Sequence, residues 1–167
     1  MTTTEQTTTG SAYGRLCALL AEQDAPYRLI EHEPQGCTEL ASELRGHDLA
    51  QAAKCLVVVV RPDKRTSRFV LAVVPGDRRL DLDKVRELGG GRKAGFASRE
   101  TAERLAGCVS GTIMPFSFHP ELELLVDEDL LHQDTLYFNA AKLDLSMALS
   151  TADYVRVTRP RTASISQ

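Results

Sequence analysis

One segment constrains the fold of this chain more than any other. From Ala52 to Val60 the sequence reads Ala-Ala-Lys-Cys-Leu-Val-Val-Val-Val. A continuous apolar run rich in valine is typical of a strand that is buried on both faces of a sheet. Lys54 is its only charged residue, so burial would hold the ammonium in low-dielectric surroundings, where a charge needs a partner. The run therefore predicts a central strand with a candidate functional lysine near its start. The alternative is a structural lysine that extends from the strand end to solvent.

A loop far downstream has the second notable pattern. It runs from Gly111 through Thr112, Ile113 and Met114 to Pro115. Glycine lets another molecule approach the backbone closely, and proline stiffens the far end of the loop. Together with Lys54, the loop suggests a site for a small polar substrate that carries phosphate. The alternative is an ordinary turn at the end of a strand.

The length and the ends of the chain predict one domain. A chain of 167 residues buries a core without disulfide bonds, and it leaves no room for a second domain. Residues 1–10 and 159–167 are polar and aperiodic, so we expect two mobile tails around a folded domain of residues 11–158. The first residues do not resemble a signal peptide, and no apolar run reaches the length of a bilayer span. We expect a cytoplasmic protein with no membrane partner.

Charge and cysteine content exclude some classes of function. A net charge of −3 argues against a protein that coats long nucleic acid, although Arg61, Lys64, Arg65 and Arg68 in one connection leave local contact open. The four cysteines are widely spaced, and no histidine stands at a zinc-ligand spacing from them. We expect no metal and no cofactor. The triple glycine at 89–91 is a weak phosphate-loop signal because it follows a helix and lacks the lysine-serine pair.

Periodicity and turn residues outline helices and strands without a strict alternation. The pattern predicts a mixed α/β or α+β domain. The expected strands are Tyr27–Glu31, 52–60, Phe69–Val74, Leu122–Val126, Thr135–Phe138 and Leu145–Leu149. The expected helices start at Tyr13, at Thr38 as a cap, after Asp81 and after Ser98, with short helical turns at Asp127–Leu131 and after Ser150.

The motifs occur in the order of a known family over residues 13–157. They are Glu31–Pro34, Arg45–His47, Ala53-Lys54, Val74–Asp81, Phe96–Ser98 and Gly107–Phe116. On these residues the chain resembles the YbaK and prolyl-tRNA synthetase insertion-domain superfamily of aminoacyl-tRNA deacylases. The YeaK-like branch is indicated by Ser117–Pro120, Phe138–Ala140 and Thr151–Tyr154.

The resemblance implies a fold and an activity. The fold is one domain with a mixed, mostly antiparallel sheet surrounded by helices. The activity is metal-independent trans-editing, the hydrolysis of the ester that joins a small amino acid such as serine, threonine or alanine to the wrong tRNA. The implied partner is the acceptor end of mischarged tRNA, with an aminoacyl-tRNA synthetase or an elongation factor as a further candidate. Two alternatives remain: a non-catalytic module that binds aminoacyl-tRNA or nucleotide, and a hydrolase of another small ester or thioester.

The resemblance also assigns site residues. The implied catalytic residues are Lys54, Gly111 and Pro115, where Lys54 contacts the terminal adenosine and its phosphate and the loop backbone holds the ester and the attacking water. The implied substrate-binding residues are His32, Thr112, Ile113, Met114, Asn139 and Asp144. Taken without the family, His32 is equally a surface histidine and Asn139 a strand-end residue bonded to backbone. Ala141 stands where close relatives have glycine, which puts the amino-acid preference in question.

Overall fold

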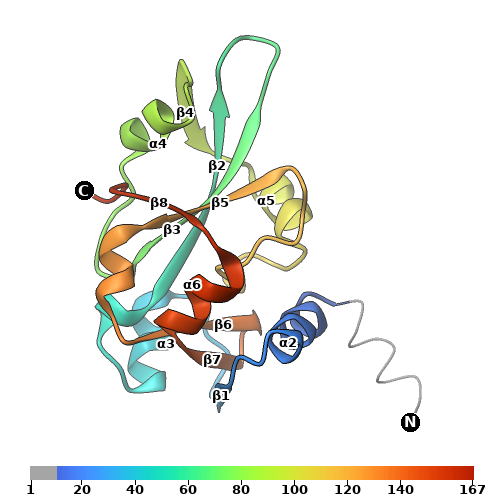
Figure 1. Ribbon diagram of the computed structural model, residues 1–167, viewed down its shortest axis with the longest axis vertical. Coiled ribbons are helices and arrows are strands. Elements are labelled where there is room, and N and C mark those ends of the chain that lie inside the picture. Colours follow the sequence, from blue (N-terminus) through green and yellow to red (C-terminus); the bar gives the residue numbers. More distant parts are fainter. Residues whose placement is uncertain (1–10) are drawn as a thin grey trace.

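The computed structural model describes residues 11–167, and the expected N-terminal tail 1–10 lies outside the described residues. Figure 1 shows the path of the chain. The helices are α2 (Ala12–Glu22), α3 (Thr38–Arg45), α4 (Leu82–Leu88), α5 (Arg99–Ala106) and α6 (Thr151–Thr158), with short 3-10 helices η1 (Leu49–Gln51) and η2 (Glu128–His132). The strands are β1 (Tyr27–Glu31), β2 (Ala53–Arg61), β3 (Arg68–Pro75), β4 (Lys93–Phe96), β5 (Leu122–Asp127), β6 (Thr135–Lys142), β7 (Leu145–Ser150) and β8 (Arg161–Ala163).

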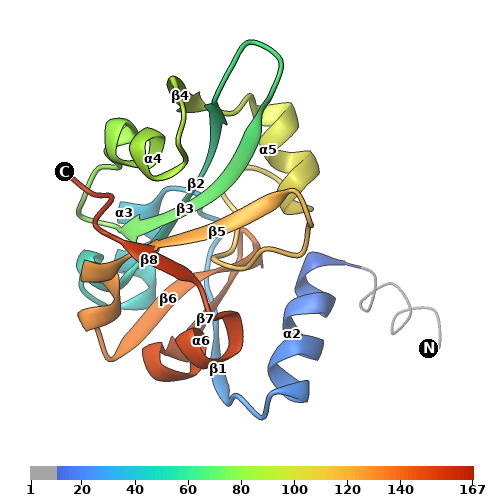
Figure 2. The same ribbon diagram turned by 45° about the horizontal axis from the view of Figure 1, so that its top comes forward.

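These strands form two sheets in a mixed α/β domain, which confirms the expected fold class. A five-stranded sheet has the order β4-β2-β3-β5-β8, and an antiparallel three-stranded sheet has the order β1-β7-β6. In the larger sheet β4, β2 and β3 are antiparallel neighbours, whereas β3, β5 and β8 run parallel. A single bridge from Ala52 to Tyr137 joins the sheets just before β2. The sequence suggested one sheet, and the division into two is seen most easily in Figure 2.

The valine-rich strand β2 is packed on both faces, as its sequence predicts. Ala53 and Val57 belong to the core shared with the three-stranded sheet and helices α2, α5 and α6. Val58 and Val60 belong to a second, smaller core on the side of α4. Since successive strand residues point to opposite faces, Lys54 shares the α4 side with Val58 and Val60. The lysine therefore lies on one defined face of the central sheet.

The loops at the helix ends follow the expected turn chemistry. Asp81 caps α4 by accepting hydrogen bonds from the backbone N–H groups of Asp83 and Lys84. Gly46 ends α3 with φ 76°, a left-handed conformation that favours glycine. The cap of α3 differs from expectation, because Cys37 occupies the N-cap position and Thr38 is the first helical residue.

The C-terminal segment corrects the sequence-based expectation of a mobile tail at 159–167. The chain instead adds β8 to the edge of the larger sheet beside β5. Ile165 is fully buried in the smaller core, and Ser166 is buried as well. The backbone N–H of Asp81 donates to the Ile165 carbonyl at 2.8 Å, and that of Gln167 donates to the Arg79 carbonyl at 2.8 Å. We call residues 161–167 the C-terminal strap, because they fasten the loop between β3 and α4.

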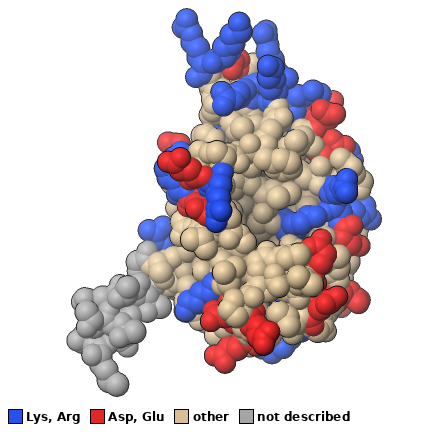
Figure 3. Space-filling model, turned by 180° about the vertical axis from the view of Figure 1, so that it is seen from behind, with Lys and Arg blue, Asp and Glu red and all other residues tan. Residues whose placement is uncertain are grey.

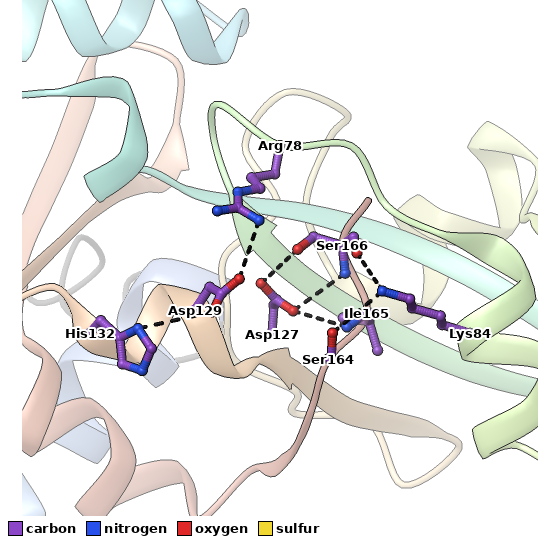
Figure 4. Close-up of polar contacts among 8 residues, drawn as sticks. All are labelled: Arg78, Lys84, Asp127, Asp129, His132, Ser164, Ile165 and Ser166. Atoms are coloured by element: carbon purple, nitrogen blue, oxygen red, sulfur yellow. Dashed lines mark hydrogen bonds and ion pairs between the residues drawn. The ribbon is translucent and has the colours of Figure 1, made fainter.

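A buried aspartate holds this strap in place (Figure 4). Asp127, at the end of β5, is fully buried. Its carboxylate accepts hydrogen bonds from the Ile165 N–H at 2.9 Å, the Ser166 N–H at 3.3 Å and the Ser166 hydroxyl at 3.0 Å. Lys84 adds a bond from α4 to the Ser166 carbonyl at 2.9 Å. A buried charge is tolerated only when it is hydrogen-bonded, and these donors meet that need.

Candidate active site

A cavity of about 470 Å³ opens between the two sheets, and its walls come from segments far apart in the sequence. The space-filling view from behind shows a hollow near the centre of the face, bordered by Lys and Arg side chains (Figure 3). The volume of the cavity falls in the range of small-molecule sites. The lining residues come from α3 and the segment before it, the first half of β2, the end of β4, α5, the loop around Gly111 and β6. They include Gly36, Arg45, Lys54, Cys55, Phe96, Arg99, Ser110, Gly111, Ile113 and Asn139.

An open stretch of sheet edge forms one wall. The strand β4 pairs with β2 only from Val58 to Arg61. The Val57 carbonyl still accepts a hydrogen bond from the Ala97 N–H at 2.9 Å on that edge. Because residues two apart in a strand direct their N–H and C=O groups to the same edge, the backbone of Cys55 faces the edge that β4 leaves uncovered. The early end of β4 therefore makes room for a ligand beside β2.

Lys54 stands on this wall, partly buried. Its ammonium donates a hydrogen bond to the carbonyl oxygen of Arg78, in the loop that the C-terminal strap fastens. The Arg78 guanidinium forms an ion pair with Asp129 at 3.3 Å. Within residues 11–167, no carboxylate forms an ion pair with Lys54. The ammonium is thus positioned by a neutral acceptor and keeps its charge available to an anionic ligand.

The Gly111 loop forms another wall of the cavity. Gly111 has φ 88°. A Cβ atom at this position would lie 3.1 Å from the Cα of Gly36, so two backbones approach closely here and both glycines are needed. The Ser110 N–H donates to the Glu103 carboxylate at 2.7 Å, and the pKa of that carboxyl is lowered, chiefly by this bond. The loop is therefore anchored to α5 immediately before Gly111.

Only part of the predicted loop faces the cavity. Gly111 and Ile113 line it, whereas Thr112 and Met114 are buried away from it. The Thr112 hydroxyl donates to the Val109 carbonyl at 2.6 Å and closes the turn. Pro115 accepts a hydrogen bond at its carbonyl from the buried Tyr154 hydroxyl at 2.7 Å. Thr112, Met114 and Pro115 therefore shape and anchor the loop, and do not line the cavity.

Asn139 connects the loop to the smaller sheet, and it also lines the cavity. Its amide group donates to the carbonyl oxygens of Gln35 at 2.8 Å and Gly111 at 3.0 Å. Its side-chain oxygen accepts from the Ser146 hydroxyl at 3.0 Å and from Arg45 at 3.3 Å. One side chain thus fixes the two glycine-containing segments, residues 35–36 and the Gly111 loop, that meet at the cavity.

Arg45 is a cavity residue to which sequence reasoning gave no role, although it lies in one of the family motifs. Its Nε donates to His47 at 2.9 Å and its guanidinium to the Ser146 hydroxyl at 3.2 Å. Burial lowers the pKa of Arg45 to about 10. In the described part of the chain it has no ion pair with a carboxylate. His47 in turn stacks on Tyr137 with ring centroids 3.9 Å apart. A buried guanidinium with neutral partners can bind carbonyl and hydroxyl groups of a ligand.

Two more of the predicted substrate-binding residues, His32 and Asp144, lie outside the cavity lining, as Thr112 and Met114 do. His32 is at the outer end of the network, with Nε2 2.6 Å from the Ser146 hydroxyl and Nδ1 2.7 Å from the Glu33 carbonyl. Because a carbonyl only accepts, Nδ1 carries a proton. Asp144 is exposed in the turn between β6 and β7, and its carbonyl accepts from the His32 N–H at 3.0 Å. His32 therefore reaches the cavity only through Ser146.

Residues 11–167 offer neither an activated cysteine nor a group of metal ligands. Cys55 lines the cavity, but burial raises the pKa of its thiol, which is opposite to what a thiolate nucleophile requires. Residues 11–167 contain no group of three His, Cys, Asp or Glu side chains that could hold a metal ion. Across the same residues, no helix has the length and apolar character needed to cross a membrane.

Comparison with known proteins identifies the family of the chain. The model of the aminoacyl-tRNA editing domain family matches residues 32–157. The chain is 41% identical over 158 residues to the Multifunctional Ser/Thr-tRNA deacylase ProXp-y of Escherichia coli K12, covering 94% of each protein. It is 23% identical over 146 residues to the Prolyl-tRNA editing protein ProX of Acetoanaerobium sticklandii, covering 85% of this chain and 87% of the relative.

Solved structures share the fold. The hypothetical protein APE2540 superposes with a TM-score of 0.82 at 23% identity, covering 91% of this chain and 99% of the other. A candidate trans-editing enzyme for prolyl tRNA synthetase superposes with a TM-score of 0.77 at 22% identity, covering 93% and 97%. The family match spans most of the chain, and it agrees with the resemblance seen in the motifs. This protein therefore belongs to the aminoacyl-tRNA editing domain family.

Proposed function

We propose that the protein is a trans-editing deacylase that hydrolyses the ester between a small amino acid and the terminal ribose of a mischarged tRNA. The observation that carries the proposal is that Lys54 and Gly111 line the same cavity. A relative with 41% identity bears the name Ser/Thr-tRNA deacylase, which supports serine and threonine as the first amino acids to test.

Lys54 would bind the phosphate of the terminal nucleotide. Its ammonium now donates to the Arg78 carbonyl, and an incoming phosphate offers a charged acceptor in place of that neutral one. A charge-assisted hydrogen bond contributes about 1.5–3 kcal/mol. Lys54 is partly exposed on the wall of the cavity, so it can make this contact without a change of fold.

The Gly111 loop would hold the ester. The Gly111 carbonyl is occupied by Asn139, whereas its N–H donates to no other group of residues 11–167. That N–H is free to donate to the ester carbonyl oxygen as it becomes negatively charged, and one such donor contributes about 10²- to 10³-fold in rate. Water attacks the carbonyl carbon, the bond to the ribose oxygen breaks, and that oxygen takes the proton. The products are the free amino acid and uncharged tRNA.

Arg45 and Asn139 would set the selection of the amino acid. Both line the cavity beside the Gly111 loop, and both belong to one hydrogen-bonded network with Ser146. Asn139 already has partners for both amide protons and for its oxygen, so it positions Arg45, whose guanidinium keeps one N–H for a substrate hydroxyl. A substrate side chain with a hydroxyl group matches such a lining.

The test measures release of radiolabelled amino acid from seryl-, threonyl-, alanyl- and prolyl-tRNA. We expect the wild type to hydrolyse one or more of these esters, and Lys54→Ala to raise KM by about 10- to 100-fold because one charge-assisted bond is lost. Lys64→Ala, the same substitution on the exposed connection between β2 and β3, is the matched control and should leave the rate unchanged.

A second variant tests the loop. Gly111→Ala places a Cβ atom 3.1 Å from the Gly36 backbone and should lower kcat. Circular dichroism separates this effect from unfolding. If every tRNA remains charged in the presence of the folded wild-type protein, the deacylase proposal is wrong.

A further inference from the structure

A second cavity of about 480 Å³ lies next to the first. It is bounded by the start of β2, the loop before α4 and the chain end, and it includes Arg79, Leu80, Asp81, Leu82, Asp83 and Gln167. Three residues line both cavities: Lys54, Leu56 and Phe96. The two cavities are therefore neighbours, and these three side chains form their common border.

Packing does not explain why a phenylalanine occupies position 96. Its side chain is 58% exposed, and it belongs to neither core cluster. It is the last residue of β4, at the point where that strand stops covering β2. An exposed phenylalanine at the border of two cavities is a flat apolar surface on which a planar ring can stack.

The second cavity is lined by two cations and two acids, and the cations are the groups that a phosphate could bind. Lys54 is the only charged residue that lines both cavities. Arg79 is exposed and makes no ion pair within residues 11–167. The acids there have partners, because Asp81 caps α4 and Asp83 pairs with Arg86 at 3.4 Å. Lys54 and Arg79 can therefore bind a phosphate, whereas Asp81 and Asp83 already have partners within the protein.

We propose that the second cavity binds the unpaired nucleotide that precedes the terminal nucleotide of the tRNA, and that Phe96 stacks on its base. This inference rests on the proposed function. The aminoacylated terminal nucleoside occupies the first cavity, the preceding nucleoside occupies the second, and the phosphate that joins them lies at Lys54 on their common border. Aromatic side chains bind bases of single-stranded nucleic acid in this way, with little dependence on base identity.

The experiment compares two substrates that share the reacting ester. One is seryl-adenosine 5′-phosphate, which has the terminal nucleotide alone, and the other is the seryl ester of the dinucleotide CpA. Phe96→Ala should raise KM for the dinucleotide by about 5- to 150-fold, the range found when a stacking aromatic is truncated. It should leave KM for the single nucleotide within about twofold. Phe96→Tyr keeps the ring and should behave as the wild type does.

Leu44→Ala provides the matched control, because Leu44 is an exposed apolar residue, 45% accessible, that lines neither cavity. The inference is overturned if Phe96→Ala weakens both substrates equally, since the ring would then serve the terminal nucleotide, or if it weakens neither.

A binding measurement separates this inference from the proposed function. If the wild type hydrolyses no ester, equilibrium binding of uncharged CpA and of adenosine 5′-phosphate still tests the second cavity. The inference requires CpA to bind at least fivefold more tightly, with the difference lost in Phe96→Ala. Equal affinities for the two ligands would refute it, whatever the catalytic result.

Discussion

Replacing Asp127 by alanine should lower the free energy of unfolding by about 3–5 kcal/mol, although Asp127 is remote from the candidate active site. The carboxylate is fully buried and accepts three hydrogen bonds from the C-terminal strap. If the strap stays in place, alanine leaves three buried donors unpaired at about 1–3 kcal/mol each.

The chain end can instead detach and hydrate its donors. Detachment loses the burial of Ile165, about 1.5–3 kcal/mol. It also loses the two backbone hydrogen bonds to Arg79 and Asp81, which contribute about 0.5–1.5 kcal/mol each. The sum is about 2.5–6 kcal/mol by the same principles, and the protein adopts the less costly of the two outcomes. The middle of that range is about 4 kcal/mol, so we expect a loss of about 3–5 kcal/mol.

Urea unfolding followed by circular dichroism measures this loss, and a thermal scan should show Tm lowered by about 6–20 °C. Asp127→Asn should cost about 1.5 kcal/mol or less, because the amide oxygen still accepts from both N–H groups and the amide nitrogen donates to the Ser166 hydroxyl. Asp129→Ala is the matched control. That carboxylate is 40% exposed and makes surface ion pairs, which contribute about 0–1 kcal/mol. The reasoning is wrong if Asp127→Ala stays within about 1 kcal/mol of the wild type, or if asparagine costs as much as alanine.

Two further predictions concern the loops around the site. The pKa of Glu103 is lowered from 4.5 in the folded protein by its bond to the Ser110 N–H, so its contribution to loop order is complete above pH 4.5 and is lost as the pH falls through the lowered value. Glutamine does not titrate, so Glu103→Gln should abolish the fall in the rate of ester hydrolysis below pH 4.5. If the rate of the variant still falls there, another group causes the fall. Ala141 has φ 60°, where a non-glycine residue costs about 1–2 kcal/mol, whereas glycine adds about 0.4–1 kcal/mol of unfolded-state entropy. Ala141→Gly should therefore stabilise the protein by about 0.5–1 kcal/mol in urea unfolding. Because Ala141 does not line the first cavity, the ratio of seryl to threonyl hydrolysis should stay within about twofold; a larger change would contradict this placement.

Local signals predicted much of the fold because the residues that carry them act within a few positions. The valine run predicted a two-faced central strand, and Gly46 and Gly107 marked the helix ends that the structure shows. The strand β4 was missed because it has four residues and contains glycine. The strap was missed because its order depends on Asp127, which lies 38 and 39 positions away from its backbone partners.

The sequence likewise predicted those residues of the candidate site that carry a local signal and missed one that does not. Lys54 and Gly111 stand out in the sequence because a lone charge in an apolar run and a glycine near a proline are local patterns. Arg45 does not stand out, because an arginine near the end of a helix is usually a solvated residue. Its role arises from Asn139 and Ser146, which are 94 and 101 positions away and belong to the other sheet.

The two halves of the site are positioned by different parts of the fold. Lys54 belongs to the larger sheet, and its acceptor at Arg78 lies in the loop that the C-terminal strap fastens. Gly111 is held by Asn139 on the smaller sheet and by the neighbouring bond of Ser110 to α5. If Lys54 binds the phosphate and the Gly111 loop holds the ester, as proposed, damage to the strap should first weaken phosphate binding and raise KM, whereas damage to the Asn139 network should displace the ester and lower kcat. The two sheets contact each other through a shared core and the bridge from Ala52 to Tyr137. Substitutions around Gly111 on one side of the site can therefore leave the position of Lys54 on the other side unchanged. Under the proposed roles, substitutions in the Asn139 network should change which amino acid is removed, while Lys54 keeps its contact with the nucleic acid.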